Sequence, residues 1–119
     1  MKYFFDTYAL FEIMNDKPGY RKFAGEDMVT SILNLGELYY GLMRDGGAKF
    51  AQERYAKIKC MIIPVTEDSV KRAMEFRFAN SHKLSYIDCI GYQLAKENNL
   101  LFLTGDKAFE GIENVEFVK

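Results

Sequence analysis

The sequence has few of the residues that build thiolate, disulfide-stabilised or triad-based sites. Its 119 residues include two cysteines, one histidine, two prolines and no tryptophan. Cys60 and Cys89 are far apart and fall in no CxxC or histidine-rich spacing, which disfavours a zinc site and a disulfide framework. We expect both thiols to be small buried apolar groups. With His82 as the only histidine and no serine–histidine or cysteine–histidine signature, a nucleophilic triad has little support.

Long hydrophobic runs are also missing. No apolar stretch approaches the ~18 residues that a membrane-spanning helix needs. The opening residues, MKYFFD, reach an acidic residue too early for a signal peptide. No low-complexity stretch or repeat suggests a linker. We therefore expect one cytoplasmic domain over residues 1–119, with no membrane contact.

An excess of charge of one sign is absent as well. Sixteen Lys and Arg residues face 17 Asp and Glu residues, for a net charge of −1. This balance disfavours a non-specific nucleic-acid-binding protein, which normally has a basic excess, but not an enzyme that contacts nucleic acid locally. What the chain does have is ten Phe and eight Tyr, 15% aromatic residues. That is more than a small core needs, and it indicates an interface.

Hydrophobic periodicity predicts an α/β domain. Expected strands occupy residues 2–5, 28–30, 61–65, 100–103 and 115–118. Expected helices occupy residues 7–14, 20–24, 32–43, 48–59, 66–81 and 85–98, with a turn or short helix at 105–109. The Asp45-Gly46-Gly47 segment ends the helix that begins at Ile32. Strands that alternate with helices imply a central parallel sheet, here of four or five strands, covered on both faces.

Two acidic residues directly follow two of the expected strands. Asp6 comes after the first strand, and Thr104, Gly105 and Asp106 come after the fourth. Ligands of open parallel sheets bind beyond the carboxyl ends of the strands, so Asp6 and Asp106 are expected to meet at one edge. The alternative is that each aspartate only caps the short helix that follows it.

Asp88 lies within the helix expected at 85–98. The polar arc of that helix includes Gln93 and Glu97, and Asp88 falls well outside it. A carboxylate on the packed side of a helix is costly unless a partner or a cation neutralises it, which makes Asp88 a candidate site residue. The alternative is a structural capping box with Ser85.

Carboxylates grouped without nearby histidine or cysteine suit a hard divalent cation with oxygen ligands, Mg²⁺ or Mn²⁺. Such an ion can activate water and stabilise the charge that builds on phosphorus, so phosphodiester hydrolysis is the natural chemistry. The hydrophobic periodicity gives no reason to choose Glu37 as a site residue. Glu37 lies in the middle of its helix near Arg44, where a solvated glutamate is common. Most basic residues are expected on solvated helix faces, and Arg44 is the best candidate for an RNA contact.

Four segments contain the candidate acids: YFFDTYAL at 3–10, SILNLGELYYG at 31–41, LSYIDCIGYQLA at 84–95 and LLFLTGDKAF at 100–109. In this order and spacing they resemble the PIN-domain nucleases, in particular the VapC-like toxins of toxin–antitoxin pairs. Each segment alone is a weak signal, whereas the four together span nearly the whole chain. The resemblance implies a single PIN-like nuclease domain.

The resemblance also implies an acidic tetrad of Asp6, Glu37, Asp88 and Asp106 around Mg²⁺ or Mn²⁺. It implies that the Thr104 hydroxyl orients a metal-bound water or a ligand. Members of the family cleave RNA as metal-dependent endoribonucleases and leave a 5′-phosphate and a 3′-hydroxyl. They commonly form homodimers and are silenced by a small antitoxin that covers the site. The corresponding partners expected here are RNA, an antitoxin and a second copy of the chain.

Two positions depart from the family pattern. Tyr8 stands where members often carry a small polar residue, and it is expected to reshape the pocket. Members often carry a further acid after the last motif aspartate; only Glu110 could serve here, and it stays outside the core set. A catalytically silent PIN-like module that binds a partner protein or RNA is the main alternative. A phosphatase or phospho-acceptor domain is disfavoured, because Tyr8 replaces the second acid expected after the first strand.

Overall fold

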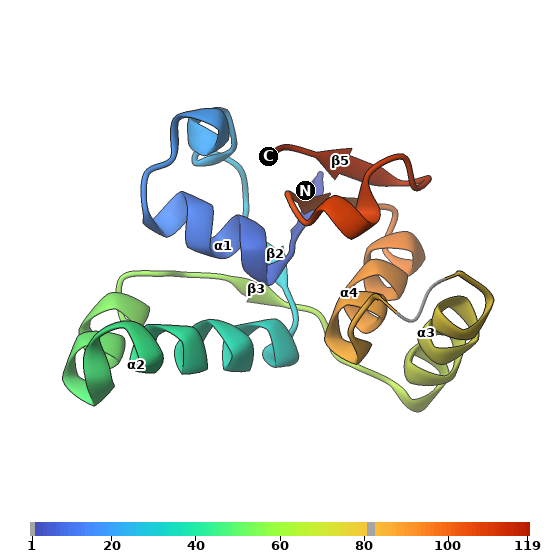
Figure 1. The fold of residues 1–119 in the computed structure, drawn as a ribbon, viewed down its shortest axis with the longest axis horizontal. Coiled ribbons are helices and arrows are strands. Elements are labelled where there is room, and N and C mark those ends of the chain that lie inside the picture. Colours follow the sequence, from blue (N-terminus) through green and yellow to red (C-terminus); the bar gives the residue numbers. More distant parts are fainter. Residues whose placement is uncertain (1, 81–82) are drawn as a thin grey trace.

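A five-stranded parallel sheet organises the molecule (Figure 1). The computed structural model describes residues 2–80 and 83–119, and the strands lie in the order β3-β2-β1-β4-β5. Every neighbouring pair is parallel, which confirms the predicted α/β class and parallel sheet. The strands are β1 (Tyr3–Phe5), β2 (Val29–Thr30), β3 (Met61–Ile62), β4 (Leu101–Thr104) and β5 (Val115–Phe117).

The helices alternate with the strands as the periodicity predicts. Those before β4 are α1 (Thr7–Met14), the 3₁₀ helix η1 (Pro18–Phe23), α2 (Ile32–Tyr55), α3 (Glu67–Asn80) and α4 (Tyr86–Glu97), and the 3₁₀ helix η2 (Lys107–Phe109) follows β4. Gly47, at φ 87° and ψ 179°, interrupts α2 at the predicted Asp45-Gly46-Gly47 break. Residue 81, where the third long helix was expected to end, and His82 lie outside the described residues.

The second half of α2 is shorter than predicted. The helix expected to reach residue 59 ends at Tyr55, because the chain must extend before Met61 to join the sheet. The amide of Met61 donates a 2.8 Å hydrogen bond to the carbonyl of Met28, at the start of β2. Residues 56–60 therefore form the connection between α2 and β3.

The strand predicted at 61–65 contains only Met61 and Ile62. β3 is an edge strand, and its neighbour β2 ends at Thr30, since Ser31 already caps α2. A last ladder bond runs from the amide of Ile63 to the carbonyl of Thr30 at 2.9 Å. Beyond it the chain has no strand to pair with.

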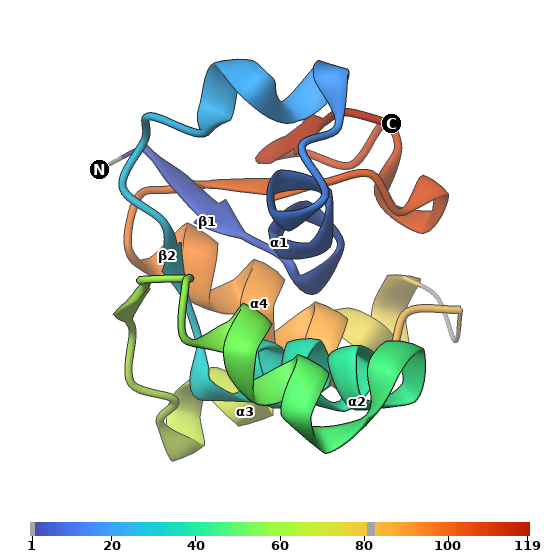
Figure 2. The ribbon, with the colours of Figure 1, turned by 90° about the vertical axis from the view of Figure 1, so that its left-hand side faces the viewer.

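The sheet separates two hydrophobic layers, because successive strand side chains point to opposite faces. Phe4 and Phe102 pack in the layer formed with α3 and α4. Tyr3, Phe5 and Leu103 pack with α1, η1 and α2. Figure 2 shows α1 in front of β1 and α4 behind it. Among the described helices, none combines the length and the apolar character needed to cross a membrane.

Close packing brings α4 onto the sheet. A Cβ atom at Gly91 would stand 3.0 Å from the Phe4 ring and 3.2 Å from the Phe102 ring. A larger side chain there would push the helix away from β1 and β4. The small residue therefore keeps the first turn of α4, with Asp88, close to the strand ends.

Candidate active site

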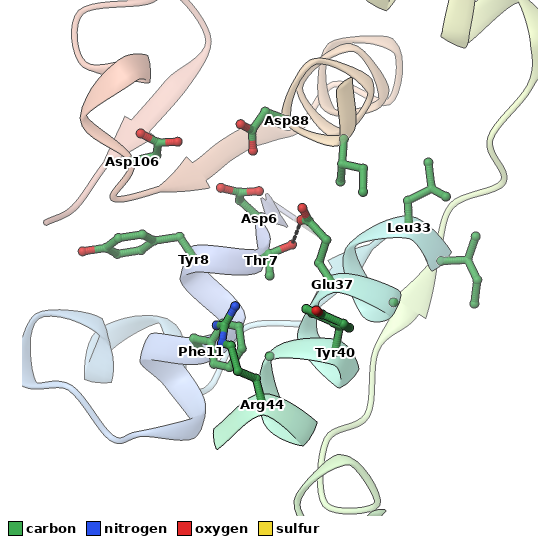
Figure 3. A pocket seen from close by; sticks show the side chains of 14 residues that line it. Asp6, Thr7, Tyr8, Phe11, Leu33, Glu37, Tyr40, Arg44, Asp88 and Asp106 are labelled. Atoms are coloured by element: carbon green, nitrogen blue, oxygen red, sulfur yellow. Dashed lines mark hydrogen bonds between the residues drawn. The ribbon is translucent and has the colours of Figure 1, made fainter. Parts of the chain in front are cut away.

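An open cavity of about 700 Å³ lies at the carboxyl edge of the sheet (Figure 3). Asp6 follows β1, Asp106 follows β4, Glu37 belongs to α2 and Asp88 belongs to the first turn of α4. All four predicted carboxylates line this cavity. The remaining lining residues are Thr7, Tyr8, Phe11, Ile32, Leu33, Gly36, Tyr40, Gly41, Arg44 and Ile87.

Asp6 is the most buried of the four acids, with 2% of its surface exposed. Its Oδ2 atom accepts a 2.8 Å hydrogen bond from the hydroxyl of Thr104, and its Oδ1 atom accepts a 3.4 Å bond from the amide of Asn34. Burial raises the pKa of Asp6 to about 7, and the charges of Asp88 and Glu37 add to the rise. The Thr104 hydrogen bond acts in the opposite direction.

Glu37 is half-buried and reaches the cavity from the second turn of α2. Its Oε1 atom accepts a 2.7 Å hydrogen bond from the hydroxyl of Thr7. Burial raises the pKa of Glu37, and the charge of Asp88 contributes further, whereas the Thr7 hydrogen bond opposes the rise. The resemblance, and not the helical periodicity, identified this cavity residue.

Asp88 both caps its helix and lines the cavity. Its amide donates to the Ser85 hydroxyl, and its Oδ2 atom accepts from the Ser85 amide, each at 3.0 Å. The predicted capping box is therefore present. Burial raises the pKa of Asp88, the charge of Asp106 adds to the rise, and the capping bonds lower it. The structural and functional interpretations of this residue are compatible.

Thr104 and Asp106 are joined by a short turn after β4. The amide of Asp106 donates to the Thr104 hydroxyl at 3.1 Å, and the Asp106 Oδ1 atom caps η2 by accepting from the Ala108 amide at 3.0 Å. Thr104 is fully buried, and its hydroxyl bonds to Asp6 rather than facing the cavity. Its predicted contact with a water or a ligand stays a prediction. Glu110 is exposed and lies outside the cavity lining.

Tyr8, the residue that departs from the family pattern, forms part of the cavity wall. Its ring presses on Gly105, the residue between Thr104 and Asp106. A Cβ atom at Gly105 would lie 2.3 Å from the Tyr8 ring and 2.5 Å from the carbonyl oxygen of Val118. Glycine at this position therefore lets Tyr8 and the Asp106 turn sit side by side.

Two polar residues of the site escaped the sequence analysis. Thr7 bonds to Glu37, and the fully buried Asn34 bonds to both Asp6 and Thr7. The only local signal was the position of Asn34, three residues after the cap Ser31 and three before Glu37 on one side of α2.

The donor set fits a hard divalent cation. Among the residues that the structure describes, the cavity wall carries four Asp and Glu side chains and no His or Cys. Carboxylate oxygens are the ligands that Mg²⁺ and Mn²⁺ prefer. Burial raises the pKa of three of these groups, Asp6, Glu37 and Asp88, and the charges of neighbouring acids add to the rise. A cation between them would favour their ionised forms. As the side chains stand, no three Asp, Glu, His or Cys side chains of the described residues form a ready ligand cluster, so a cation would bind only after side chains move.

The sequence profile of the PIN domain family matches residues 3–115. The chain belongs to the PIN domain family. The resemblance inferred from the four segments is thereby confirmed, and the cavity carboxylates lie within the matched residues. No curated protein gave a significant sequence match.

Solved structures of toxins share this PIN fold. VapBC2 from Rickettsia felis, bound to a DNA fragment from its promoter, superposes with a TM-score of 0.76 at 19% identity, covering 100% of both chains. VapC20 of Mycobacterium tuberculosis, a sarcin–ricin loop cleaving toxin, gives 0.75 at 21% identity over 97% of this chain and 99% of that one. A toxin–antitoxin complex from Klebsiella pneumoniae gives 0.73 at 22% identity over 98% and 96%. At these identities the likeness is one of fold.

Proposed function

We propose that this PIN-domain protein is a divalent-metal-dependent endoribonuclease and the toxin of a type II toxin–antitoxin pair. One observation carries the proposal. Four carboxylates from four separate elements line a single open cavity at the carboxyl edge of the sheet. Such convergence is expected of a metal site, and the local hydrogen bonds of Asp6, Asp88 and Asp106 do not by themselves require four carboxylates to face one cavity.

In the proposed site Asp6, Asp88 and Asp106 hold Mg²⁺ or Mn²⁺. Glu37 binds the ion through water or assists the nucleophile. A divalent ion there would stabilise the negative charge that builds on the phosphate and would lower the pKa of water. Thr104 keeps Asp6 oriented through its 2.8 Å hydrogen bond. The expected products carry a 5′-phosphate and a 3′-hydroxyl.

RNA is the proposed substrate, reached in the cytoplasm. Arg44 and Tyr40 line the cavity beyond Glu37, and both are exposed. A guanidinium can bind a phosphate oxygen of the chain, and a tyrosine ring can stack on a base. Both groups lie beside the carboxylates, so they would hold the backbone near the acidic cluster.

A small antitoxin and a second copy of the chain are the proposed protein partners. Large aromatic side chains lie on the surface, with Phe78, Tyr40 and Tyr86 exposed to 84%, 70% and 62%. Side chains of this size are enriched at protein interfaces. The relatives from Klebsiella pneumoniae and Rickettsia felis were solved as toxin–antitoxin assemblies, which supports an antitoxin partner here.

The Asp6→Asn variant tests the mechanism. It keeps the size of the side chain but removes a charge that the cation needs, so we expect RNA cleavage to fall at least about 100-fold. Cleavage of total RNA by the purified protein is measured with Mg²⁺ or Mn²⁺, and again after chelation. Chelation should abolish the wild-type activity.

Asp27→Asn is the matched control, because Asp27 is exposed and precedes β2 at the opposite edge of the sheet. Its activity should equal that of the wild type. Equal cleavage by wild type and Asp6→Asn would refute the mechanism. RNA binding without cleavage or cation dependence would favour the catalytically silent PIN-like module instead.

A further inference from the structure

A buried chain of hydrogen bonds lies behind the cavity carboxylates. Asn34, in the first turn of α2, has 0% of its surface exposed. Its Nδ2 atom donates to the Thr7 hydroxyl at 3.1 Å and to the Asp6 carboxylate at 3.4 Å. Its Oδ1 atom accepts a 2.7 Å bond from the Ser31 hydroxyl. The amide of Asn34 thus contacts Asp6 directly and Glu37 through the Thr7 hydroxyl, which bonds to Glu37 Oε1 at 2.7 Å.

The direction of these bonds is determined by the groups that take part. The form of Asp6 that binds a cation is ionised and only accepts hydrogen bonds, so in that form the NH₂ side of the Asn34 amide must face Asp6. The Thr7 oxygen then accepts from Asn34, and its single hydrogen is free for one acceptor. Glu37 Oε1 at 2.7 Å is a far better acceptor than the Asn34 carbonyl at 3.5 Å. Ser31 therefore donates to Asn34, Asn34 donates to Thr7, and Thr7 donates to Glu37.

Packing alone does not account for an amide in this place. A buried polar side chain costs free energy unless its hydrogen bonds are made, and an apolar residue would fill the same volume without that cost. All buried side-chain nitrogen and oxygen atoms of the described residues have partners, including those of Asn34. The Asn34 amide donates its hydrogen bonds to Asp6 and to the Thr7 hydroxyl, which in turn bonds to Glu37.

We propose that Asn34 is a positioning residue that, together with the Thr7 hydroxyl, holds the carboxylates of Asp6 and Glu37 in the orientation needed to bind the cation. This inference rests on the proposed function. Asn34 does not touch substrate or ion. It acts through the groups it orients, as the partners of metal-binding carboxylates do in general.

Mn²⁺ binding to the full chain tests the proposal without relying on activity. Calorimetric titration with Mn²⁺ alone compares the wild type with Asn34→Leu and Thr7→Val, which keep similar volume but lose the donors. Each variant should bind Mn²⁺ at least about tenfold more weakly. Because both residues act in one chain of bonds, the double variant should be within about twofold of the weaker single one.

Two further variants separate positioning from folding. Thr7→Ser keeps the hydroxyl and should restore the affinity to within about threefold of wild type. Thr66→Val removes a hydroxyl that caps α3 through the Ser69 amide at 3.1 Å, so it should lower the melting temperature and leave Mn²⁺ affinity unchanged. Wild-type affinity in Asn34→Leu and Thr7→Val, or losses that multiply in the double variant, would overturn the proposal.

The outcome is distinguishable from failure of the ribonuclease proposal. If the wild type binds Mn²⁺, the variants bind it weakly and no protein cleaves RNA, the positioning role stands and the ribonuclease function falls. If the wild type cleaves RNA and all variants bind Mn²⁺ equally, only the positioning role falls. A wild type that binds no Mn²⁺ overturns both.

Discussion

Asp6 combines a nearly complete loss of solvent contact with two acidic neighbours across the cavity. Its hydrogen bonds from Thr104 and Asn34 compensate only partly, because the pKa of Asp6 still rises to about 7. In the metal-free protein an ionised Asp6 therefore destabilises the fold. In the proposed metal site, binding of a cation would offset this cost of ionising a buried carboxylate.

The pH dependence of stability follows from the sign of this shift. The folded protein holds the Asp6 proton up to about pH 7, whereas the unfolded chain releases it near 3.8. The unfolding free energy of the metal-free protein should therefore fall as the pH rises from 4 to 7, by on the order of 4 kcal/mol from this group. Asp6→Asn should show a clearly smaller decrease, measured by denaturant unfolding with a chelator present.

Asp27→Asn provides the comparison, because it removes an exposed carboxylate of the same type. It should follow the wild-type pH profile. Glu37 and Asp88 also have raised pKa values, so some decrease should persist in Asp6→Asn. Identical profiles for wild type and Asp6→Asn would show that burial of Asp6 has no energetic cost.

Gly47 divides the helix α2 into two parts that place different residues. The part before Gly47 carries Asn34 and Glu37 to the cavity, and the part after it turns back toward β3. Gly47 has a backbone conformation, φ 87° and ψ 179°, that residues with a Cβ atom almost never adopt. The break between the parts therefore depends on this glycine.

Gly47→Ala should lower the unfolding free energy by about 1–3 kcal/mol. No atom lies within 4 Å of a Cβ built there, so the cost is backbone strain and not a clash. Gly25→Ala is the control, because Gly25 has equally open surroundings and no positive φ. Thermal or denaturant unfolding of the two variants measures the difference. Equal stability of both would mean that α2 can run straight through position 47.

Element types were predictable because each depends on nearby residues. The Ser85 cap, the Asp45-Gly46-Gly47 break and the apolar strand runs are local signals, and the structure confirms each. The lengths of β3 and of the second half of α2 were not predictable. They depend on where β2 ends and on the Met61–Met28 hydrogen bond, which links distant parts of the chain.

The site was predictable to a similar extent. Parallel-strand logic placed Asp6 and Asp106 together from their position after apolar runs. Glu37 needed the resemblance, since nothing in its own helix distinguishes it from a solvated glutamate. Asn34 was missed because its partners Asp6 and Thr7 lie 28 and 27 positions away and meet it only after β1 and β2 pair.

On the scale of the whole molecule, the four carboxylates that line the cavity bring the net charge close to zero. Without Asp6, Glu37, Asp88 and Asp106, the chain has 16 basic and 13 acidic residues, a charge of +3. Two divalent ions in the cavity would give the same net value. A cation would thus bring both the cavity and the whole surface to a charge compatible with a polyanion.

Added Mn²⁺ should stabilise the protein more at pH 8 than at pH 5. Protons compete with the ion for carboxylates whose pKa values are raised, and that competition is weak at pH 8. At a free ion concentration 100-fold above the dissociation constant, the added stability is about 2.7 kcal/mol. Melting temperatures with and without Mn²⁺ at the two pH values measure the effect. An equal or larger shift at pH 5 would contradict it.

β4 lies between β1 and β5 and brings Thr104 within a hydrogen bond of Asp6, 98 positions earlier in the chain. A ribosome therefore makes the first acid of the cavity long before the strand that aligns it. A nascent chain that stops before residue 101 already contains Asp6, Glu37 and Asp88 but lacks that strand. The cavity can be completed only after Asp106 has been synthesised and β4 has inserted, so until then the growing chain lacks the full set of four cavity carboxylates.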